Sequence, residues 1–311
     1  MKLSIVATLY HSAEYIAEFH RRASAAARQL VGDDYEIVLV NDGSPDKSLE
    51  LAIQLSDIDS HVVLIDLSRN FGHHKAMMAG LEHSSGERIF LIDSDLEEEP
   101  EWLLDFEPQM ALENVDVVYG QQEERKGGWF ERVSGAIYYS LFDMLCNINH
   151  PRSIVTARLM TRRYVEALLR FRERELVISC LWVITGFRQS KRIVKKHAAS
   201  GSTYSLSKKI GHAVNAVTSF SELPLQLIFY VGIGIFFCSI LYAAKLVLYG
   251  LVRSQAVDGW TSVMVSIWVL GGMTISFVGI IGIYLSKVFT ETKQRPYTIV
   301  REIYGQSKPK H

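Results

Sequence analysis

Cysteine is scarce in this sequence of 311 residues, and the few cysteines exclude two kinds of site. Cys146, Cys180 and Cys238 lie far apart, without the spacing of metal ligands and without a pairing pattern. We therefore expect neither a cysteine metal site nor a disulfide framework. Such a set of cysteines fits a reducing compartment.

Several other signals are also missing. The net charge is −1 and the pI is near 6.8, so there is no global signal for nucleic-acid binding. No Gly-x-Gly-x-x-Gly follows the first predicted strand, which argues against an NAD enzyme, and there is no Walker A motif. The chain starts with the strand-like run Lys2–Thr8 instead of an apolar signal segment, so we expect no signal peptide.

Apolar, β-rich runs recur in the first 120 residues, with helix-like stretches between them. One helix is expected over Ser12–Leu30, and a second is opened by Pro45. This alternation predicts βαβ units and an α/β fold with a mostly parallel sheet. The predicted strands are Leu3–Thr8, Glu36–Val40, Val62–Leu67, Ile89–Ile92 and Val115–Tyr119.

The run Ile89–Ile92 ends in two carboxylates, Asp93 and Asp95. Four consecutive apolar residues suit a strand covered on both faces, and open α/β sheets bind ligands at the carboxyl ends of such strands. Two neighbouring carboxylates that stay ionised need a cation, which a divalent ion carrying a diphosphate supplies. A solvated turn after the strand is the alternative interpretation.

Two further segments carry polar groups after predicted strands. Asp42, in Asn41-Asp42-Gly43-Ser44, can accept hydrogen bonds from a base or ribose, although an ordinary Asx turn has the same sequence. Arg69 can reach a diphosphate. His73 and His74 are adjacent, and neighbours on a helix point about 100° apart. We therefore interpret these histidines as polar residues at a helix start and not as ligands of one metal.

Together these segments resemble family-2 glycosyltransferases. The motifs occur in order as Asn41–Ser44, Arg69–Gly72 with Ala79–Leu81, and Asp93–Leu96 with Pro100-Glu101. The chain is most similar to bacterial polyprenyl-phosphate glycosyltransferases, relatives of dolichyl-phosphate mannose synthase, over nearly its whole length. The resemblance implies a GT-A, Rossmann-like fold, a UDP- or GDP-linked sugar donor, a magnesium or manganese ion and polyprenyl phosphate as acceptor.

The resemblance also implies three groups of site residues. The nucleotide sugar would be bound by Thr8, Tyr10, Asp42, Arg69 and Asp93. Metal binding and catalysis would fall to Asp93 and Asp95. The acceptor phosphate would be bound by Arg125, Arg132 and Arg158.

The chain departs from the family pattern at several places, including Thr203, where the family has a lysine. Thr8–Ser12 replaces a Pro-Val-Tyr-Asn-Glu segment, so an acidic nucleoside contact is lost. The run Glu97–Glu99 either tightens metal binding or caps the helix that begins near Pro100, and we favour the cap. Thr156 stands where relatives usually carry an aspartate that is a candidate base.

The threonine at position 156 bears on the acceptor. A phosphate monoester has a second pKa of about 6 and is largely a dianion at neutral pH. Such a nucleophile needs positioning and charge screening more than proton removal. Thr156 therefore favours a phosphate acceptor, or else a lost activity.

Long uncharged runs mark the C-terminal part. Leu223–Ala244 has no charge over 22 residues and Gly259–Ser286 none over 28, and about 20 suffice to span a bilayer. These runs predict a two-helix transmembrane hairpin. Basic residues on both sides of it place both termini in the cytoplasm and the short loop outside. Before it, apolar residues of 129–145 recur at helical spacing, as in a core helix or one in the membrane interface.

The sequence thus divides into a nucleotide-sugar-binding core (1–125), an acceptor-side region with juxtamembrane amphipathic helices (126–222), two transmembrane helices (223–287) and a cytoplasmic tail (288–311). Our hypothesis is that the chain is a multi-pass protein of the bacterial cytoplasmic membrane. It would transfer a sugar to polyprenyl phosphate in a metal-dependent reaction that inverts the configuration at the anomeric carbon. The tail residues Arg295–Val300 resemble an oligomerisation segment, which implies a homo-oligomer. A polysaccharide synthase is one alternative, but the Gln-x-x-Arg-Trp motif is absent. A degenerate paralogue that binds nucleotide or lipid as an assembly partner is the other.

Overall fold

The computed structural model describes residues 1–122, 153–173, 177–196, 225–235 and 259–305, with four isolated helical positions at 237, 241, 242 and 245. The chain forms two compact units. The first comprises Met1–Asp143, Ile148–Thr203 and Arg295–His311, and the second comprises Met144–Asn147 and Tyr204–Gln294.

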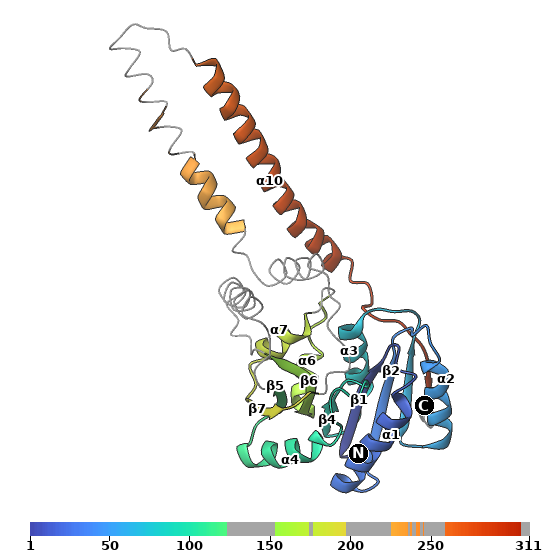
Figure 1. Ribbon diagram of the computed structural model, residues 1–311. Helices are drawn as coiled ribbons and strands as arrows, with labels where there is room; N and C mark the ends of the chain where they lie inside the picture. Colours follow the sequence, from blue (N-terminus) through green and yellow to red (C-terminus); the bar gives the residue numbers. More distant parts are fainter. Residues whose placement is uncertain are drawn as a thin grey trace. The chain divides into compact units, whose positions relative to one another are not determined.

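One eight-stranded sheet forms the centre of the first unit (Figure 1), in the order β7-β5-β6-β4-β1-β2-β3-β8. Neighbouring strands are parallel except where β6 lies between β4 and β5 and where β8 lies beside β3. The sheet is therefore mixed but mostly parallel, as predicted. Its strands are β1 (Leu3–Leu9), β2 (Tyr35–Asn41), β3 (Val62–Leu67), β4 (Arg88–Leu91), β5 (Val117–Gln122), β6 (Ile154–Thr161), β7 (Gln189–Val194) and β8 (Val300–Tyr304).

All five strands predicted in the first 120 residues are confirmed as β1 to β5, with small shifts at their ends. The sheet also continues beyond residue 125, because β6, β7 and β8 come from the segments that we assigned to the acceptor side and the tail. The tail strand β8 pairs with β3 of its own chain, Leu64 opposite Tyr304. This pairing covers one edge of β3, which would otherwise expose unpaired backbone groups.

Helices cover both faces of the sheet (Figure 1). On β1, alternate residues such as Ile5 and Ala7 join the core cluster with Phe19 of α1, while Val6 points to the other face and meets α3. The helix α3 approaches closely because it carries Gly80 there. The helices are α1 (Ile16–Val31), α2 (Ser48–Ile58), α3 (His73–His83), α4 (Trp102–Glu113), α6 (Arg162–Leu168) and α7 (Ile178–Ile184).

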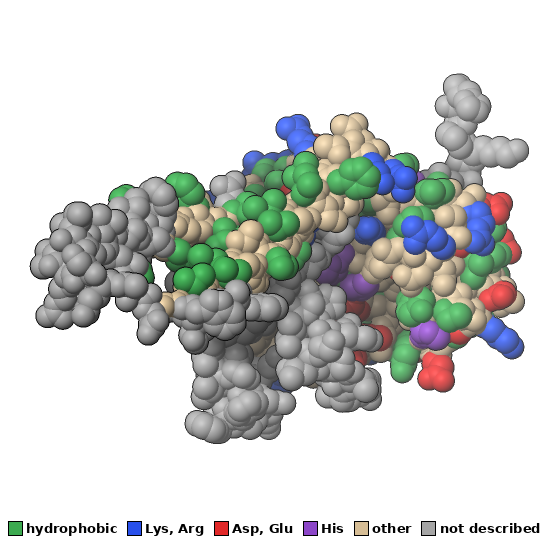
Figure 2. All heavy atoms as spheres, turned by 90° about the horizontal axis from the view of Figure 1, so that it is seen from above, with side chains coloured by type: hydrophobic (Ala, Val, Ile, Leu, Met, Phe, Trp, Pro, Cys, Tyr) green, Lys and Arg blue, Asp and Glu red, His purple; other side chains and the backbone are tan. Residues whose placement is uncertain are grey.

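The second unit contains a long apolar helix, α10 (Trp260–Thr292). Its segment Val269–Thr292 has a mean hydropathy of 1.9 and no buried share, so it is long and apolar enough to cross a membrane. Hydrophobic side chains dominate the described surface of this unit in Figure 2, whereas charged side chains gather on the first unit. The second predicted span therefore exists as a helix.

The predicted two-helix hairpin is not present in the described residues. They contain one helix of membrane-spanning length. Of the first predicted span, they show a helix over Leu225–Ile235 and helical positions at 237, 241 and 242. The loop between the spans and the apolar stretch 129–145 lie outside the described residues.

Gly80 provides a test of how α3 packs on the sheet. A Cβ atom at this position would lie 2.5 Å from Val6 Cγ1 and 2.9 Å from Val40 Cγ2. We expect Gly80→Ala to lower the free energy of unfolding by about 1–3 kcal/mol through overpacking. The double variant Gly80→Ala/Val6→Ala removes the closer clash, that with Val6 Cγ1, and leaves that with Val40 Cγ2, so its cost should be less than the sum of the two single costs. Chemical unfolding of the purified chain measures the free energy of unfolding of each variant. If the cost of the double variant equals the sum of the single costs, the close packing of Gly80 on Val6 is contradicted.

Candidate active site

The polar residues of interest meet at one edge of the sheet. The strands β1, β2, β4 and β7 all end there, because they run in the same direction, and β6 begins there, because it runs the opposite way. The prediction that Asp42 and Asp93 follow the carboxyl ends of their strands is confirmed. Two residues from far along the chain, Thr156 at the start of β6 and Lys196 after β7, lie at the same edge.

Asp93 is held by contacts to two other segments. Its Oδ2 accepts a hydrogen bond of 2.9 Å from the hydroxyl of Thr156. Its Oδ1 lies 3.2 Å from Nε2 of His73, the first residue of α3, and the Nδ1 of that ring lies 3.0 Å from Thr8 Oγ1. Oδ1 itself is buried and has no hydrogen bond of good geometry. The sequence identified Thr8 and Asp93 but did not assign His73 this position between them.

The charges at this edge influence one another. Burial by itself raises the pKa of Asp93, but the nearby ring of His73, together with Thr156 and Lys196, outweighs it, so the pKa is lowered. Burial likewise lowers the pKa of His73, and Asp93 more than reverses this. The pKa of Asp95 is raised by burial and by the charge of Asp93. A divalent cation between the two aspartates would relieve that repulsion.

The carboxylates fit a magnesium or manganese ion that is shared with a substrate. Among the described residues, no group of three or more His, Cys, Asp and Glu side chains is arranged to hold a metal by itself. Magnesium in phosphate-transfer sites is commonly bound by one or two carboxylates, with substrate phosphates and water as the other ligands. Asp93, with its buried Oδ1 lacking a hydrogen bond, and Asp95 supply such a pair.

Glu98 links the Asp-x-Asp loop to β6. Its side chain is 0% exposed, and its two oxygens accept the backbone N–H groups of Thr156 at 3.0 Å and Ala157 at 2.8 Å. Burial, together with the charge of Asp93, raises its pKa to about 7. The ammonium group of Lys196 lies 3.7 Å from Glu98 and 2.9 Å from Glu97. The interpretation of this residue as a helix cap is wrong, because both its oxygens bind β6.

Asp42 organises the loop beside it. Its carboxylate accepts the backbone N–H groups of Phe71 at 2.7 Å and Gly72 at 3.0 Å, and the residue is 2% exposed. A Cβ atom on Gly43, whose φ is +60°, would lie 2.4 Å from the backbone nitrogen of Asn70, so only glycine permits this close approach. Asp42 thus anchors the segment that follows β3, and its contact with a nucleoside stays a prediction.

Tyr10 and Arg69 are both exposed at this edge. The guanidinium of Arg69 lies 4.1 Å from the centre of the Phe71 ring and donates to the carbonyl oxygen of Asn70. Each side chain can turn to a ligand without leaving a buried site. Their roles in nucleotide binding stay predictions.

Of the three arginines assigned to the acceptor phosphate, the structure describes only Arg158. Arg158 is 1% exposed; its guanidinium donates to the carbonyl oxygens of Thr156 and Val155 and lies over the ring of Trp182. Burial lowers its pKa to about 9. In contrast to the prediction, the structure encloses Arg158 where a phosphate cannot reach it. The other two, Arg125 and Arg132, lie outside the described residues.

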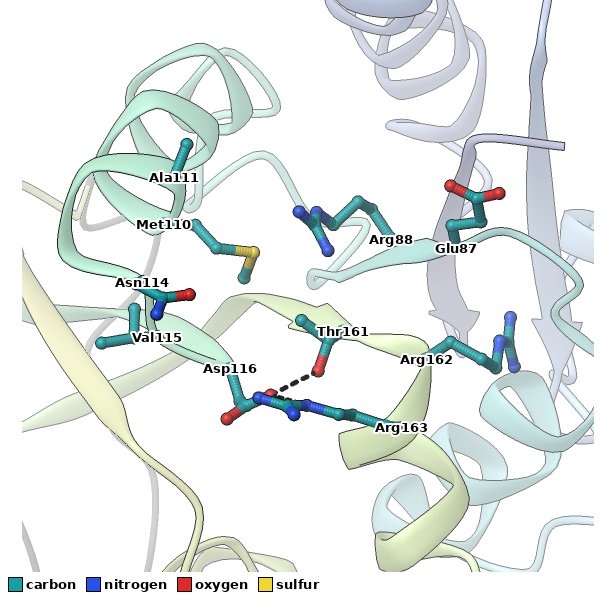
Figure 3. A pocket seen from close by; sticks show the side chains of 10 residues that line it. All are labelled: Glu87, Arg88, Met110, Ala111, Asn114, Val115, Asp116, Thr161, Arg162 and Arg163. Carbon is teal, nitrogen blue, oxygen red and sulfur yellow. Dashed lines mark hydrogen bonds and ion pairs between the residues drawn. The ribbon is translucent and has the colours of Figure 1, made fainter.

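A cavity of about 480 Å³ lies at the opposite edge of the sheet, beside the start of β4 and the end of β6 (Figure 3). Its three arginines are already engaged. Arg163 pairs with Asp116, Arg162 donates to the carbonyl oxygen of Gly86, and Arg88 lies 3.6 Å from a carboxylate of Glu107. This cavity is therefore separate from the carboxylate edge. It is lined by Glu87, Arg88, Met110, Ala111, Asn114, Val115, Asp116, Thr161, Arg162 and Arg163.

The sequence interpretation missed His73, Glu98 and Lys196 as members of the site. The position of His73 directly after the Arg69–Gly72 motif was a usable signal, because the segment after β3 must end at the same edge as Asp93. For Lys196 no local signal existed, because its contacts to Glu97 and Glu98 join segments about 100 residues apart.

The Glu98 contacts predict a specific loss of stability. In Glu98→Gln an amide nitrogen replaces one of two oxygens that accept backbone N–H groups, so two donors face each other. We expect the free energy of unfolding to fall by about 1–3 kcal/mol. The matched change Glu97→Gln loses a partly buried ion pair with Lys196 and leaves no pair of backbone N–H donors facing an amide, so it should cost less than Glu98→Gln. Urea unfolding in detergent compares the two variants. Equal losses of stability would count against the role of the buried Glu98 in holding the backbone of β6.

Comparison with known proteins places the chain in a family. The model of glycosyl transferase family 2 matches residues 4–169. A Mycobacterium tuberculosis protein named among the glycosyltransferases is 49% identical over 305 residues, which cover 98% of this chain and 89% of that one. A prophage bactoprenol glucosyl transferase homolog of Escherichia coli is 30% identical over 307 residues, covering 97% and 99%.

Two further comparisons are more distant. The bactoprenol glucosyl transferase of Shigella phage SfV is 29% identical over 304 residues, which cover 97% of this chain and 98% of that protein. Among solved structures, that of Staphylococcus aureus TarS 1-349 with UDP-GlcNAc is 17% identical, with a TM-score of 0.48 over 70% of this chain and 66% of that one, too distant to support an argument. The family match and the relatives of full length agree with the motifs and with the mixed sheet. The chain therefore belongs to glycosyltransferase family 2.

Proposed function

We propose that this protein transfers one sugar from a nucleotide sugar to polyprenyl phosphate at the cytoplasmic face of a bacterial membrane. The observation that carries the proposal is the carboxylate pair at the sheet edge, where Asp93 Oδ1 is buried without a hydrogen bond and Asp95 follows two residues later. Such a pair suits a divalent ion that carries the diphosphate of a donor. The similarity to proteins named bactoprenol glucosyl transferases supports the lipid acceptor.

In the proposed reaction, an oxygen of the acceptor phosphate forms a bond to the anomeric carbon of the sugar. The bond from that carbon to the nucleoside diphosphate breaks, its electron pair leaves with the diphosphate, and the configuration is inverted. Asp93 and Asp95 would hold a magnesium or manganese ion, which neutralises charge on the leaving diphosphate. His73 beside Asp93 lowers the pKa of that carboxyl group, which favours its ionised form.

The acceptor class follows from the residue at position 156. Thr156 donates its hydroxyl proton to Asp93 and is no base. A phosphate acceptor is already largely ionised at neutral pH and needs none. In the proposal, Thr8, Tyr10, Asp42 and Arg69 lie on the donor side. Arg125 and Arg132 bind the acceptor phosphate.

The apolar C-terminal segment supports a membrane location. A helix with the composition of Val269–Thr292 and no buried share exposes apolar surface that is unfavourable in water. We propose that it pairs with a first span over Leu223–Ala244 as a hairpin, with both termini in the cytoplasm. In this arrangement a lipid-linked acceptor and a soluble donor meet on the same side of the membrane.

The topology can be tested by labelling single cysteines. In a variant without the native cysteines, Ser254→Cys lies in the predicted outer loop and Ser307→Cys in the predicted inner tail. We expect a membrane-impermeant maleimide to label Ser254→Cys in intact spheroplasts, and Ser307→Cys after lysis alone. Labelling of both positions in intact spheroplasts would refute the hairpin.

The activity can be tested with purified full-length protein. We expect sugar to move from a radiolabelled UDP- or GDP-sugar into the lipid fraction when polyprenyl phosphate and manganese are present. Asp95→Asn should reduce transfer about 100-fold or more, because one metal ligand is lost. The matched change Asp105→Asn on the exposed surface of α4 serves as control. Absence of transfer with every common donor would contradict the proposal.

A second candidate function is that of a degenerate paralogue that binds a nucleotide without turnover. The observation in its favour is Thr156, which uses its hydroxyl to bind Asp93 and stands where the resemblance to the family implies an aspartate. Calorimetry with UDP or GDP and manganese separates the two functions. Metal-dependent binding that disappears in Asp95→Asn, without transfer to any acceptor, would favour the degenerate paralogue.

A further inference from the structure

We propose that Thr156 is a positioning residue of the carboxylate pair: its hydroxyl holds Asp93 in the orientation that leaves Oδ1 available to a divalent cation. This inference rests on the proposed function, because it concerns the same metal-diphosphate site. It assigns a role to a residue that stands where the resemblance to the family implies an aspartate. That role is orientation and not proton transfer.

The two carboxylate oxygens of Asp93 have different contacts. A threonine hydroxyl has one proton to donate, and this one goes to Oδ2 at 2.9 Å. The other oxygen, Oδ1, is buried, has no hydrogen bond and faces His73 Nε2 at 3.2 Å. A buried polar atom without a hydrogen bond is unusual and costly. A bound cation would satisfy Oδ1, and the Thr156 bond decides which oxygen is left for it.

The backbone of Thr156 is fixed from both sides. Its N–H donates to Glu98 at 3.0 Å, and its carbonyl oxygen accepts from Arg158 Nε at 3.2 Å. Glu98 is 0% exposed and Arg158 is 1% exposed, so neither side chain is free to move away. The hydroxyl is thus presented to Asp93 from a rigid strand, as an outer partner of a metal ligand must be.

This arrangement also gives a role to two buried charged side chains, Arg158 and Glu98. Arg158 lies in the interior and bonds backbone carbonyl oxygens, which holds the start of β6 in place. Glu98 holds the same strand through two N–H groups, and Lys196 at the end of β7 lies 3.7 Å from it. The residues that hold Asp93 and its partner Thr156 in place therefore extend from the end of β4 across β6 to the segment after β7.

The competing interpretation is that Thr156 is simply a good strand residue. Threonine is β-branched and suits a strand, and its hydroxyl would then add nothing to the site. Valine and serine distinguish the two interpretations. Thr156→Val keeps the branched shape and loses the hydroxyl, whereas Thr156→Ser keeps the hydroxyl and loses a methyl group.

The test measures manganese-dependent binding of UDP and of GDP by calorimetry, with full-length protein in detergent. We expect Thr156→Val to weaken this binding about 10–100-fold, which is the usual effect of losing an outer partner of a metal ligand. Thr156→Ser should restore most of the affinity. In transfer assays, Thr156→Val should lower kcat while KM for polyprenyl phosphate stays near that of the wild type. Thermal unfolding monitors whether both variants fold.

Three results would overturn the inference. If Thr156→Val binds manganese and nucleotide as tightly as the wild type, the hydroxyl does not position Asp93. If Val and Ser weaken binding equally in folded protein, the shape of the side chain matters and the hydrogen bond does not. If the wild type shows no manganese-dependent binding with either nucleotide, the proposed function fails and the inference fails with it. If the wild type binds manganese and nucleotide and Thr156→Val binds them equally well, the inference is refuted and the proposed function is not.

Discussion

The need to pair buried carboxylates is the constraint on which the edge of the sheet at the ends of its parallel strands depends. A buried charge is tolerated when it is paired or hydrogen-bonded, and is costly otherwise. Two buried acids, Asp42 and Glu98, and the partly buried Asp93 meet this requirement in different ways. Asp42 accepts two backbone N–H groups, Glu98 accepts two more beside Lys196, and Asp93 faces His73 and the hydroxyl of Thr156.

These pairings fix the segments that would surround a ligand. Asp42 holds the segment after β3, which leads into α3, and so sets where His73 begins that helix. Glu98 holds the start of β6, and so sets where Thr156 meets Asp93. A site whose dipoles and charges are in place before the ligand arrives needs little reorganisation when it binds. In the proposed function, Asp93 Oδ1 and Asp95 would bind the cation that carries the diphosphate.

The chain combines this glycosyltransferase domain with an apolar helix whose side chains are exposed. The two features agree in the acceptor that they favour. A lipid phosphate brings its own negative charge, so the threonine at position 156 is no obstacle, and its hydrocarbon chain needs a membrane. Thr156 and the apolar helix are thus both compatible with the proposed lipid phosphate acceptor.

Much of the fold could be predicted because it is encoded locally. Apolar runs such as Ile89–Ile92 identify buried strands, and acids directly after them must lie at the ligand-binding edge of a parallel sheet. This reasoning located Asp42, Asp93 and Asp95 correctly. It also located the apolar segment that forms α10, because length and hydropathy suffice for that.

The sequence by itself therefore determined the parallel core, the positions of the aspartates and the apolar C-terminal helix. Only the tertiary structure decided the partners of Asp93, the burial of Arg158 and the clamp formed by Glu98. These depend on β6 entering the sheet antiparallel between β4 and β5, so that residues 63 positions apart in sequence form one hydrogen bond. Strand order and register across such distances are set by packing of the whole sheet, and local periodicity does not encode them.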